Sequence, residues 1–237
     1  MSDPTILLVH GAFGDASSWR GVFDALGNDS SVLAAALPLR GVAADTAYLG
    51  AVIDELDDPV VLVGHSYAGC VITGAGVSDK VAALVYVAGF MPDEGESITD
   101  LQTRFPSLAM GNFLRQRTLP DATVELSVEP ERFHDIFCAD VADDLAAFMA
   151  HAQRPLAVSA FEEQAAAAAW RAKPSWAVFG TADQPIAPQL HRFSSERAGS
   201  AVTEVEGASH FLMLSKPDVV AGVIRDAVTA SVDALAV

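Results

Sequence analysis

One serine in this chain lies in a setting suited to a nucleophile. Ser66 belongs to the segment 64–68, GHSYA, which directly follows the Val-rich run 60–63 and precedes residues that suit a helix. A strand, a serine and a helix in this order are typical of a nucleophile elbow, a strained turn that exposes the serine hydroxyl. Such a turn requires small residues two positions before and after the serine, and Gly64 and Ala68 meet that requirement. The pentapeptide alone is also compatible with an ordinary turn after a buried strand.

A nucleophilic serine needs a base that takes its proton and an acid that orients the base. In a parallel sheet the carboxyl ends of the strands meet at one edge, so both partners are expected just after later strands. Asp183 follows the apolar run 176–179, and His210 follows the run 201–205. Serine, acid and histidine occur in the order that this architecture requires. We therefore predict a catalytic triad of Ser66, Asp183 and His210.

Other titratable residues fit a catalytic role less well. Asp93 and Glu94 also follow an apolar run and are the alternative acids, although their acidic segment is typical of a solvated loop. His65 adjoins the serine but should point to the opposite side of the turn, where we expect a structural hydrogen bond. Surface or packing roles are expected for three histidines that lack metal-ligand spacing, His134, His151 and His191. No metal site is predicted.

Acyl transfer also needs hydrogen-bond donors for the negative charge that develops on the carbonyl oxygen. One expected donor is the backbone amide that follows the nucleophile, in Tyr67. The tight turn 10–13 after the first apolar run brings a second stretch of backbone close to the serine, and we expect the Ala12 amide to donate there. The substrate pocket is expected to be walled by four apolar residues that fit a place in the core equally well, Phe13, Tyr67, Met91 and Leu212.

Apolar runs alternate with helical patterns over residues 1–91 and 174–237. Strands are expected at the runs 5–9, 32–36, 60–63, 81–87, 175–179 and 201–205. Amphipathic helices are expected between them and at the C-terminus, over 19–26, 48–56, 189–197 and 217–234. This alternation indicates βαβ units, so the predicted fold class is α/β, a doubly wound and mostly parallel sheet of about six strands with helices on both faces.

The alternation breaks over residues 92–173. A short strand is expected at 123–128, short helices at 131–137 and 141–152, and an alanine-rich helix at 165–169. We interpret 92–173 as a helical cap insertion that covers one end of the sheet. The length suits one α/β domain, so we expect a single domain over 1–237, with 1–91 and 174–237 as its core.

The composition is strongly acidic. Lys and Arg number 14 against 31 Asp and Glu, a formal charge of −17, and no basic run occurs. This argues against nucleic acid and anionic membranes as partners and indicates a well-solvated surface. No apolar run is long enough to span a membrane, and the first residues lack a secretory leader. The two cysteines, Cys70 and Cys138, fit a reducing compartment without a disulfide, so we expect a cytoplasmic protein.

Several of these motifs together resemble a known superfamily. They are HGA at 10–12, GHSYAG at 64–69, GFMPD at 89–93, TAD at 181–183 and SHFLML at 209–214. They resemble the α/β-hydrolases, and more closely the small esterases related to plant methylesterases, hydroxynitrile lyases and bacterial carboxylesterases. The resemblance covers nearly the whole chain and is weakest over the cap. It implies the α/β-hydrolase fold, the same triad, and cleavage of small-molecule esters without a cofactor; Ala68 departs from the glycine that most members carry there.

The resemblance leaves alternative functions to weigh. The lyase branch carries a threonine and a lysine where this chain has Gly11 and Phe211, which argues against lyase chemistry. Dehalogenases and epoxide hydrolases of this fold use an aspartate where this chain has Ser66. We expect an esterase that acts through an acyl-enzyme. The alternatives are a carbon–carbon hydrolase, lyase or perhydrolase, or a ligand receptor that retains a slow triad.

Overall fold

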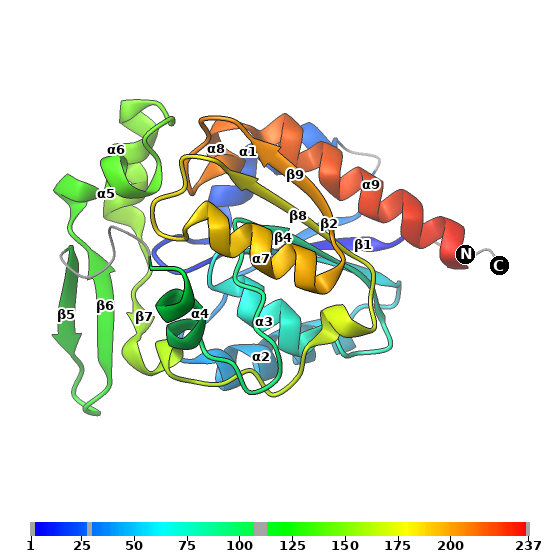
Figure 1. The fold of residues 1–237 in the computed structure, drawn as a ribbon, viewed down its shortest axis with the longest axis horizontal. Coiled ribbons are helices and arrows are strands. Elements are labelled where there is room, and N and C mark those ends of the chain that lie inside the picture. Colours follow the sequence, from blue (N-terminus) through cyan, green and yellow to red (C-terminus); the bar gives the residue numbers. More distant parts are fainter. Residues whose placement is uncertain (1–2, 28–29, 107–112, 236–237) are drawn as a thin grey trace.

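The computed structural model describes residues 3–27, 30–106 and 113–235. Its centre is a six-stranded sheet of order β2-β1-β3-β4-β8-β9 in which all neighbours are parallel (Figure 1). The strands are β1 (Thr5–Val9), β2 (Val32–Ala35), β3 (Val60–His65), β4 (Val81–Val87), β8 (Ser175–Gly180) and β9 (Ala201–Val205). The predicted α/β class, with a doubly wound parallel sheet, is confirmed.

Burial across this sheet follows the sequence pattern of each strand. β1 and β3 are apolar runs in which every residue is buried, as expected for central strands covered on both faces. The edge strands β2 and β9 are partly exposed. The chain moves outward from β1 in one direction to β2 and in the other to β3, so the strand order reverses between β1 and β3. The carboxyl ends at such a switch point form the crevice where ligands bind in open α/β sheets.

Helices cover both faces of the sheet, as Figure 1 shows. They are α1 (Arg20–Leu26), α2 (Val42–Asp54), α3 (Ala68–Ala75), α7 (Pro188–Ala198), α8 (Leu212–Ser215) and α9 (Pro217–Leu235). α1 packs with α9 on one face, and α2 packs with α3 on the other. Among the described residues, no helix is both long and apolar enough to cross a membrane.

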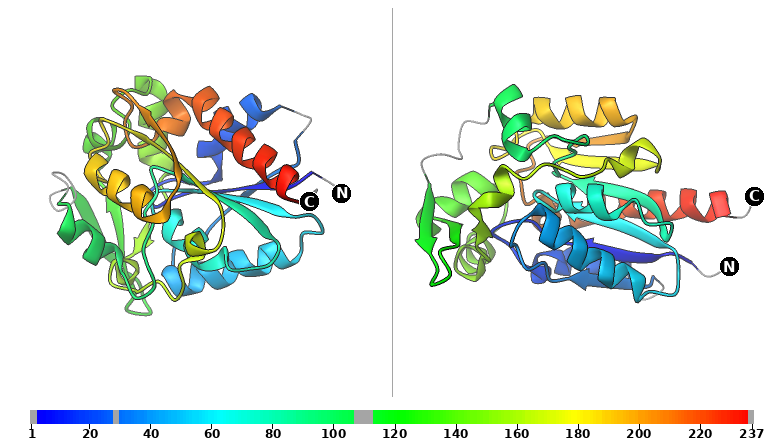
Figure 2. Two further views of the ribbon diagram at one scale, coloured as in Figure 1. Left: turned by 45° about the vertical axis from the view of Figure 1, so that its right-hand side comes forward. Right: turned by 90° about the horizontal axis from the view of Figure 1, so that it is seen from below.

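The segment 92–173, which we call the cap, is more than a set of helices. Its helices are α4 (Ile98–Arg104), α5 (Pro130–Phe137) and α6 (Asp143–Ala152), with short 3₁₀ turns η3 (Val158–Phe161) and η4 (Ala169–Arg171). It also contains an antiparallel sheet of β5 (Leu114–Thr118), β6 (Val124–Val128) and β7 (Leu156–Ala157). The strand expected at 123–128 is present as β6, but the helical cap insertion is corrected to a cap that also contains a three-stranded sheet. The part of the cap that contains α5, α6 and β5–β7 lies at the end of the core sheet opposite both chain termini, whereas η4 packs against α3 (Figures 1 and 2).

The prediction of an alanine-rich helix at 165–169 is wrong. The chain there is irregular until η4 begins at Ala169. The amide and the carbonyl of Ala165 bond instead to the backbone of Glu96 and Gly95, each at 2.9 Å. Pairing with a distant loop therefore supplies the backbone hydrogen bonds, and this tertiary contact overrides the high helix propensity of alanine.

The cap is joined to the core by direct contacts. Backbone hydrogen bonds run from the amide of Phe13 to Arg154, from Ala157 to Leu39, and from Phe211 to Phe137. In addition, the buried Glu125 carboxylate on β6 accepts from Arg40 of the core at 3.0 Å and from Arg117 on β5. The cap is thus fixed over the loops that follow β1, β2 and β9.

Candidate active site

Ser66 lies at the turn between β3 and α3, which begins two residues later at Ala68. Its φ of 53° is in the left-handed region, which costs a serine free energy and occurs where function demands it. Space around this turn is tight, because a Cβ on Gly64 would lie 2.9 Å from the Ala68 carbonyl oxygen and from Ile72. The turn therefore has the geometry of a nucleophile elbow at the switch point of the sheet.

The structure brings Ser66, His210 and Asp183 together in one hydrogen-bonded chain. Ser66 Oγ lies 2.8 Å from His210 Nε2, and His210 Nδ1 lies 2.8 Å from Asp183 Oδ2. All three residues are buried. An ionised carboxylate can only accept, so Nδ1 of His210 carries the hydrogen and Nε2 is left to accept from the serine hydroxyl. The arrangement can remove a proton from Ser66 and hold it on the imidazole.

Asp183 is held by more donors than the triad supplies. The amide of Ile186 donates to its Oδ1 at 2.9 Å, and Nε2 of His191, on α7, lies 3.0 Å from the same Oδ2 that His210 uses. Burial by itself raises the pKa of Asp183. The positive potential and hydrogen bonds of His210 and His191 outweigh burial and hold that pKa well below its ordinary value. The carboxylate therefore stays ionised over the whole pH range in which the enzyme would work.

His191 has a larger part in the site than the sequence suggested. Its ring stacks on Phe179 with centroids 4.7 Å apart, so the expected packing contact exists, but it also shares Asp183 with His210. No short motif joins Asp183 to a residue eight positions later on a helix, so no sequence pattern signals this contact.

His65 occupies the position expected of a structural residue. Its Nε2 lies 3.1 Å from the backbone carbonyl of His210, and its ring packs against Phe211 with centroids 4.7 Å apart. Burial, helped by the neighbouring His210, holds the pKa of His65 well below its ordinary value. His65 is therefore neutral and anchors the loop that carries His210.

The alternative acids Asp93 and Glu94 are not brought to the histidine. Asp93 forms a paired contact with the Arg171 guanidinium, at 2.6 and 2.9 Å, and Glu94 is exposed. Within the described residues, no group of three or more His, Cys, Asp or Glu side chains is arranged to hold a metal ion.

The two expected oxyanion donors lie beside the serine. The turn after β1 approaches the elbow so closely that a Cβ on Gly11 would lie 2.8 Å from Ser66 Cβ. Ala12 and Tyr67 both line the pocket at Ser66. In the part of the chain that the structure describes, neither amide donates to another backbone group, whereas the neighbouring Phe13 amide is bonded to Arg154.

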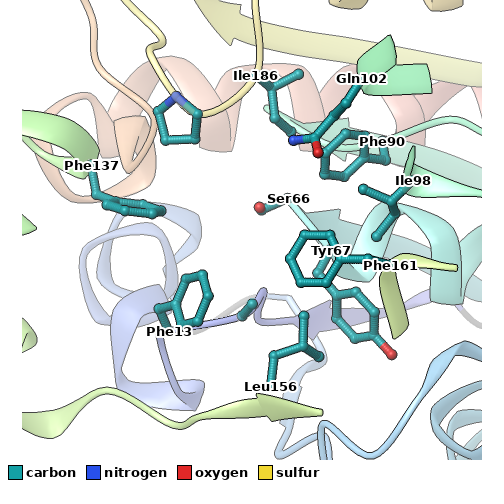
Figure 3. A pocket seen from close by; sticks show the side chains of 12 residues that line it. Phe13, Ser66, Tyr67, Phe90, Ile98, Gln102, Phe137, Leu156, Phe161 and Ile186 are labelled. Carbon is teal, nitrogen blue, oxygen red and sulfur yellow. The ribbon is translucent and has the colours of Figure 1, made fainter. Parts of the chain in front are cut away.

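A pocket of about 330 Å³, counted with its open mouth, leads to Ser66 (Figure 3). Its walls are mostly apolar and come from Ala12, Phe13, Tyr67, Phe90, Ile98, Gln102, Phe137, Leu156, Phe161, Pro185 and Ile186. Phe13 lies in the wall, as expected. Met91 and Leu212 do not line this pocket: both are buried in the core, and the Met91 sulfur faces Ser195 on α7 instead.

Comparisons with known proteins identify the family. The sequence model of the alpha/beta hydrolase family matches residues 6–223. The chain belongs to the alpha/beta hydrolase family. The resemblance noted from the motifs is therefore confirmed, and the fold agrees with solved structures of this family. A polyneuridine aldehyde esterase superposes with a TM-score of 0.80 at 19% identity, over 95% of this chain and 99% of that one.

Two further relatives carry related names. A pyrethroid hydrolase from Sphingobium faniae JZ-2 superposes with a TM-score of 0.78 at 17% identity, over 98% of this chain and 100% of that one. A carbendazim hydrolyzing esterase from Nocardioides sp. strain SG-4G is 50% identical over 50 residues. That match spans 20% of each of the two chains. The structural likenesses show the shared fold, and the relatives are named as esterases or hydrolases.

Proposed function

We propose that this protein hydrolyses small carboxylic esters through an acyl-enzyme on Ser66. The observation that carries the proposal is the continuous chain of hydrogen bonds from Ser66 through His210 to Asp183, at the floor of an apolar pocket. The names of the relatives support an ester as substrate. The apolar walls and limited volume favour short, uncharged esters.

The first half of the reaction forms the acyl-enzyme. Ser66 Oγ attacks the ester carbonyl carbon while His210 Nε2 takes the hydroxyl proton, and Asp183 stabilises the imidazolium without itself becoming protonated. The amides of Ala12 and Tyr67 donate to the oxyanion of the tetrahedral intermediate, each typically worth about 3 kcal/mol. His210 then gives its proton to the alkoxide oxygen as the carbon–oxygen bond breaks, and the alcohol leaves.

The second half uses the same groups on water. His210 takes a proton from a water molecule, the resulting hydroxide adds to the acyl carbon, and the amides of Ala12 and Tyr67 again hold the oxyanion. Collapse of the intermediate breaks the bond to Ser66 Oγ, which recovers its proton from His210. The carboxylic acid is released and the enzyme returns to its starting state.

Ser66→Ala tests this proposal. The variant should fold normally and lose roughly 10⁴-fold or more of its activity on p-nitrophenyl butanoate, because no other group can carry the acyl chain. A fluorophosphonate should label the parent protein once, at Ser66, as read by peptide mass spectrometry. Ser159→Ala, at an exposed serine of the cap, is the matched control and should keep both activity and labelling. Labelling at another serine, with Ser66→Ala still active, would overturn the assignment.

A further inference from the structure

One polar atom in the cap side of the pocket is without a partner among the described residues. Gln102, on α4, lines the pocket, and its amide nitrogen Nε2 is shielded from solvent and has no hydrogen-bond partner in the part of the chain that the structure describes. Its described neighbours in this wall, Ile98, Phe161 and Ile186, have no side-chain polar atoms to offer. Leaving a buried donor unsatisfied lowers the stability of a protein, so its presence beside a nucleophile needs an explanation.

The position of Gln102 indicates which part of an ester it would meet. Figure 3 shows its amide reaching into the pocket on the side opposite Phe137. Phe137 packs edge-on against His210, with ring centroids 5.8 Å apart. Because His210 must protonate the departing alcohol, the alcohol lies on the Phe137 side of Ser66. The acyl group then extends toward Gln102.

We propose that Gln102 recognises a hydrogen-bond acceptor in the acyl group of the substrate, which makes short esters of oxo or alkoxy acids the preferred class. The inference rests on the proposed ester hydrolysis and adds to it the chemistry of the acyl group. An acceptor is specified because the unpartnered atom is the amide nitrogen, a donor. A short chain is specified because the pocket holds about 330 Å³ together with its mouth. A plain alkanoate would bury the same donor unpaired, so it would bind with a penalty.

Matched ester pairs test this assignment. p-Nitrophenyl 4-oxopentanoate and 4-methylpentanoate have the same shape but exchange a keto oxygen for a methyl group; p-nitrophenyl methoxyacetate and butanoate exchange an ether oxygen for a methylene. For each pair the measured quantity is the ratio of kcat/KM for the oxygen-containing ester to kcat/KM for its alkyl partner. Comparing this ratio between variants cancels the different intrinsic reactivities of the esters.

Gln102→Leu removes the donor at similar volume and should lower the ratio by about tenfold or more for at least one pair, as expected for a lost buried hydrogen bond. Its thermal stability should not fall, because an unpaired buried donor is removed. Should that variant fail to fold, Gln102→Met, which fills similar space with a flexible side chain and has no donor, should lower the ratio as well. Gln189→Leu, at an exposed glutamine on α7, is the control and should leave the ratio unchanged.

The outcomes separate the two proposals. A ratio that stays within twofold for both pairs, with hydrolysis retained, would overturn the role of Gln102 and leave ester hydrolysis standing. Failure of the parent protein to hydrolyse all four esters, with no fluorophosphonate label on Ser66, would overturn the proposed function itself. A loss of thermal stability in Gln102→Leu with an unchanged ratio would show that the side chain only supports the packing of α4.

Discussion

The two walls of the pocket differ in how their groups are held. The wall built on the parallel sheet carries Ser66, with His210 and Asp183 buried behind it, and each of these three side chains is fixed by at least one hydrogen bond of about 3 Å or less. The wall built by the cap presents mainly apolar side chains that are held by packing. These are Ile98, Phe137, Leu156 and Phe161, with Gln102 among them.

Because of this difference, we expect the sheet wall to determine the reaction rate and the cap wall to determine which ester is preferred. On the sheet wall, neighbouring strands fix the backbone at the switch point, and a small displacement of any polar group is costly for every substrate. On the cap wall, a side chain other than Phe137, which packs against His210, can be exchanged without touching the proton path. We therefore expect substitutions on the sheet wall to slow all esters by a similar factor, and substitutions on the cap wall to change which ester is preferred.

Among substitutions at residues that do not touch the substrate, Asp183→Asn should cause the largest loss of kcat. The amide offers a single acceptor oxygen to donors from His210, His191 and Ile186, so its NH₂ group must face one of them. An NH₂ group that faces His210 forces the wrong tautomer on that ring, a defect that can cost about 10⁴-fold in turnover. The measurement is kcat for a series of p-nitrophenyl esters, and the loss should be the same for each.

Asp93→Asn is the matched control, because Asp93 was the competing acid and lies at the start of the cap. Its carboxylate pairs with Arg171 near the surface, where ion pairs contribute at most about 1 kcal/mol. We expect kcat to change less than about twofold. A mild Asp183→Asn together with a damaging Asp93→Asn would reverse the assignment of the acid.

The sheet wall could be predicted from sequence because local patterns determine it. Continuous apolar runs indicated the buried strands, and the small residues around Ser66 indicated the elbow. Once the strands are parallel, their carboxyl ends meet at one edge, so the loops bearing Asp183 and His210 had to lie near Ser66. The role of His191 was not predictable in this way, because its contact depends on how α7 packs on the sheet.

Phe161→Ala should change which ester is preferred rather than the overall rate. Its effect should be smaller than that of Asp183→Asn. The Phe161 ring, from η3, lies across the pocket, and its removal opens space for a longer acyl chain (Figure 3). Burying two further CH₂ groups is worth roughly 1.6 kcal/mol, so the kcat/KM ratio of hexanoate to butanoate should rise about tenfold. Rates on butanoate should change less than about threefold. An equal loss on both esters would show that the cap wall also positions the reacting groups.

The cap was predicted only in part, for physical reasons that differ between its elements. β5 has the sequence LRQRT, without apolar alternation, and its side chains are largely exposed, so only its pairing with β6 makes it a strand. α4 did carry a signal, since Ser97 and Asp100 form a capping box at its start. The pocket lining from this region, including Gln102, could not be predicted, because side chains from separated segments converge only when the cap is docked.

The histidines of the two walls should differ in how they affect stability in acid. His10 and His65, on the sheet side, are buried, and burial holds the pKa of each below its ordinary value near 6.5. His10 also accepts from the Leu37 amide through Nε2 at 3.0 Å, which a protonated ring cannot do. By contrast, His151 in the cap is exposed.

The smallest predicted effect is therefore a loss of stability in acid that comes from the two buried histidines of the core, His10 and His65. For His10 and His65 the folded pKa lies below the unfolded one, so the unfolded state binds more protons as the pH falls. Their stabilisation is complete above about pH 6.5 and is lost below it, at up to roughly 1.4 kcal/mol per pH unit for each group. Urea unfolding at pH 7.5 and pH 5.0 measures this loss.

His10→Asn should be less stable than the parent at pH 7.5 but should lose about 1–2 kcal/mol less between the two pH values, whereas His151→Asn should follow the parent. Equal losses in the parent and His10→Asn would show that His10 takes up a proton as readily in the folded protein as in the unfolded one, and the ring held neutral by its bond to Leu37 would be wrong.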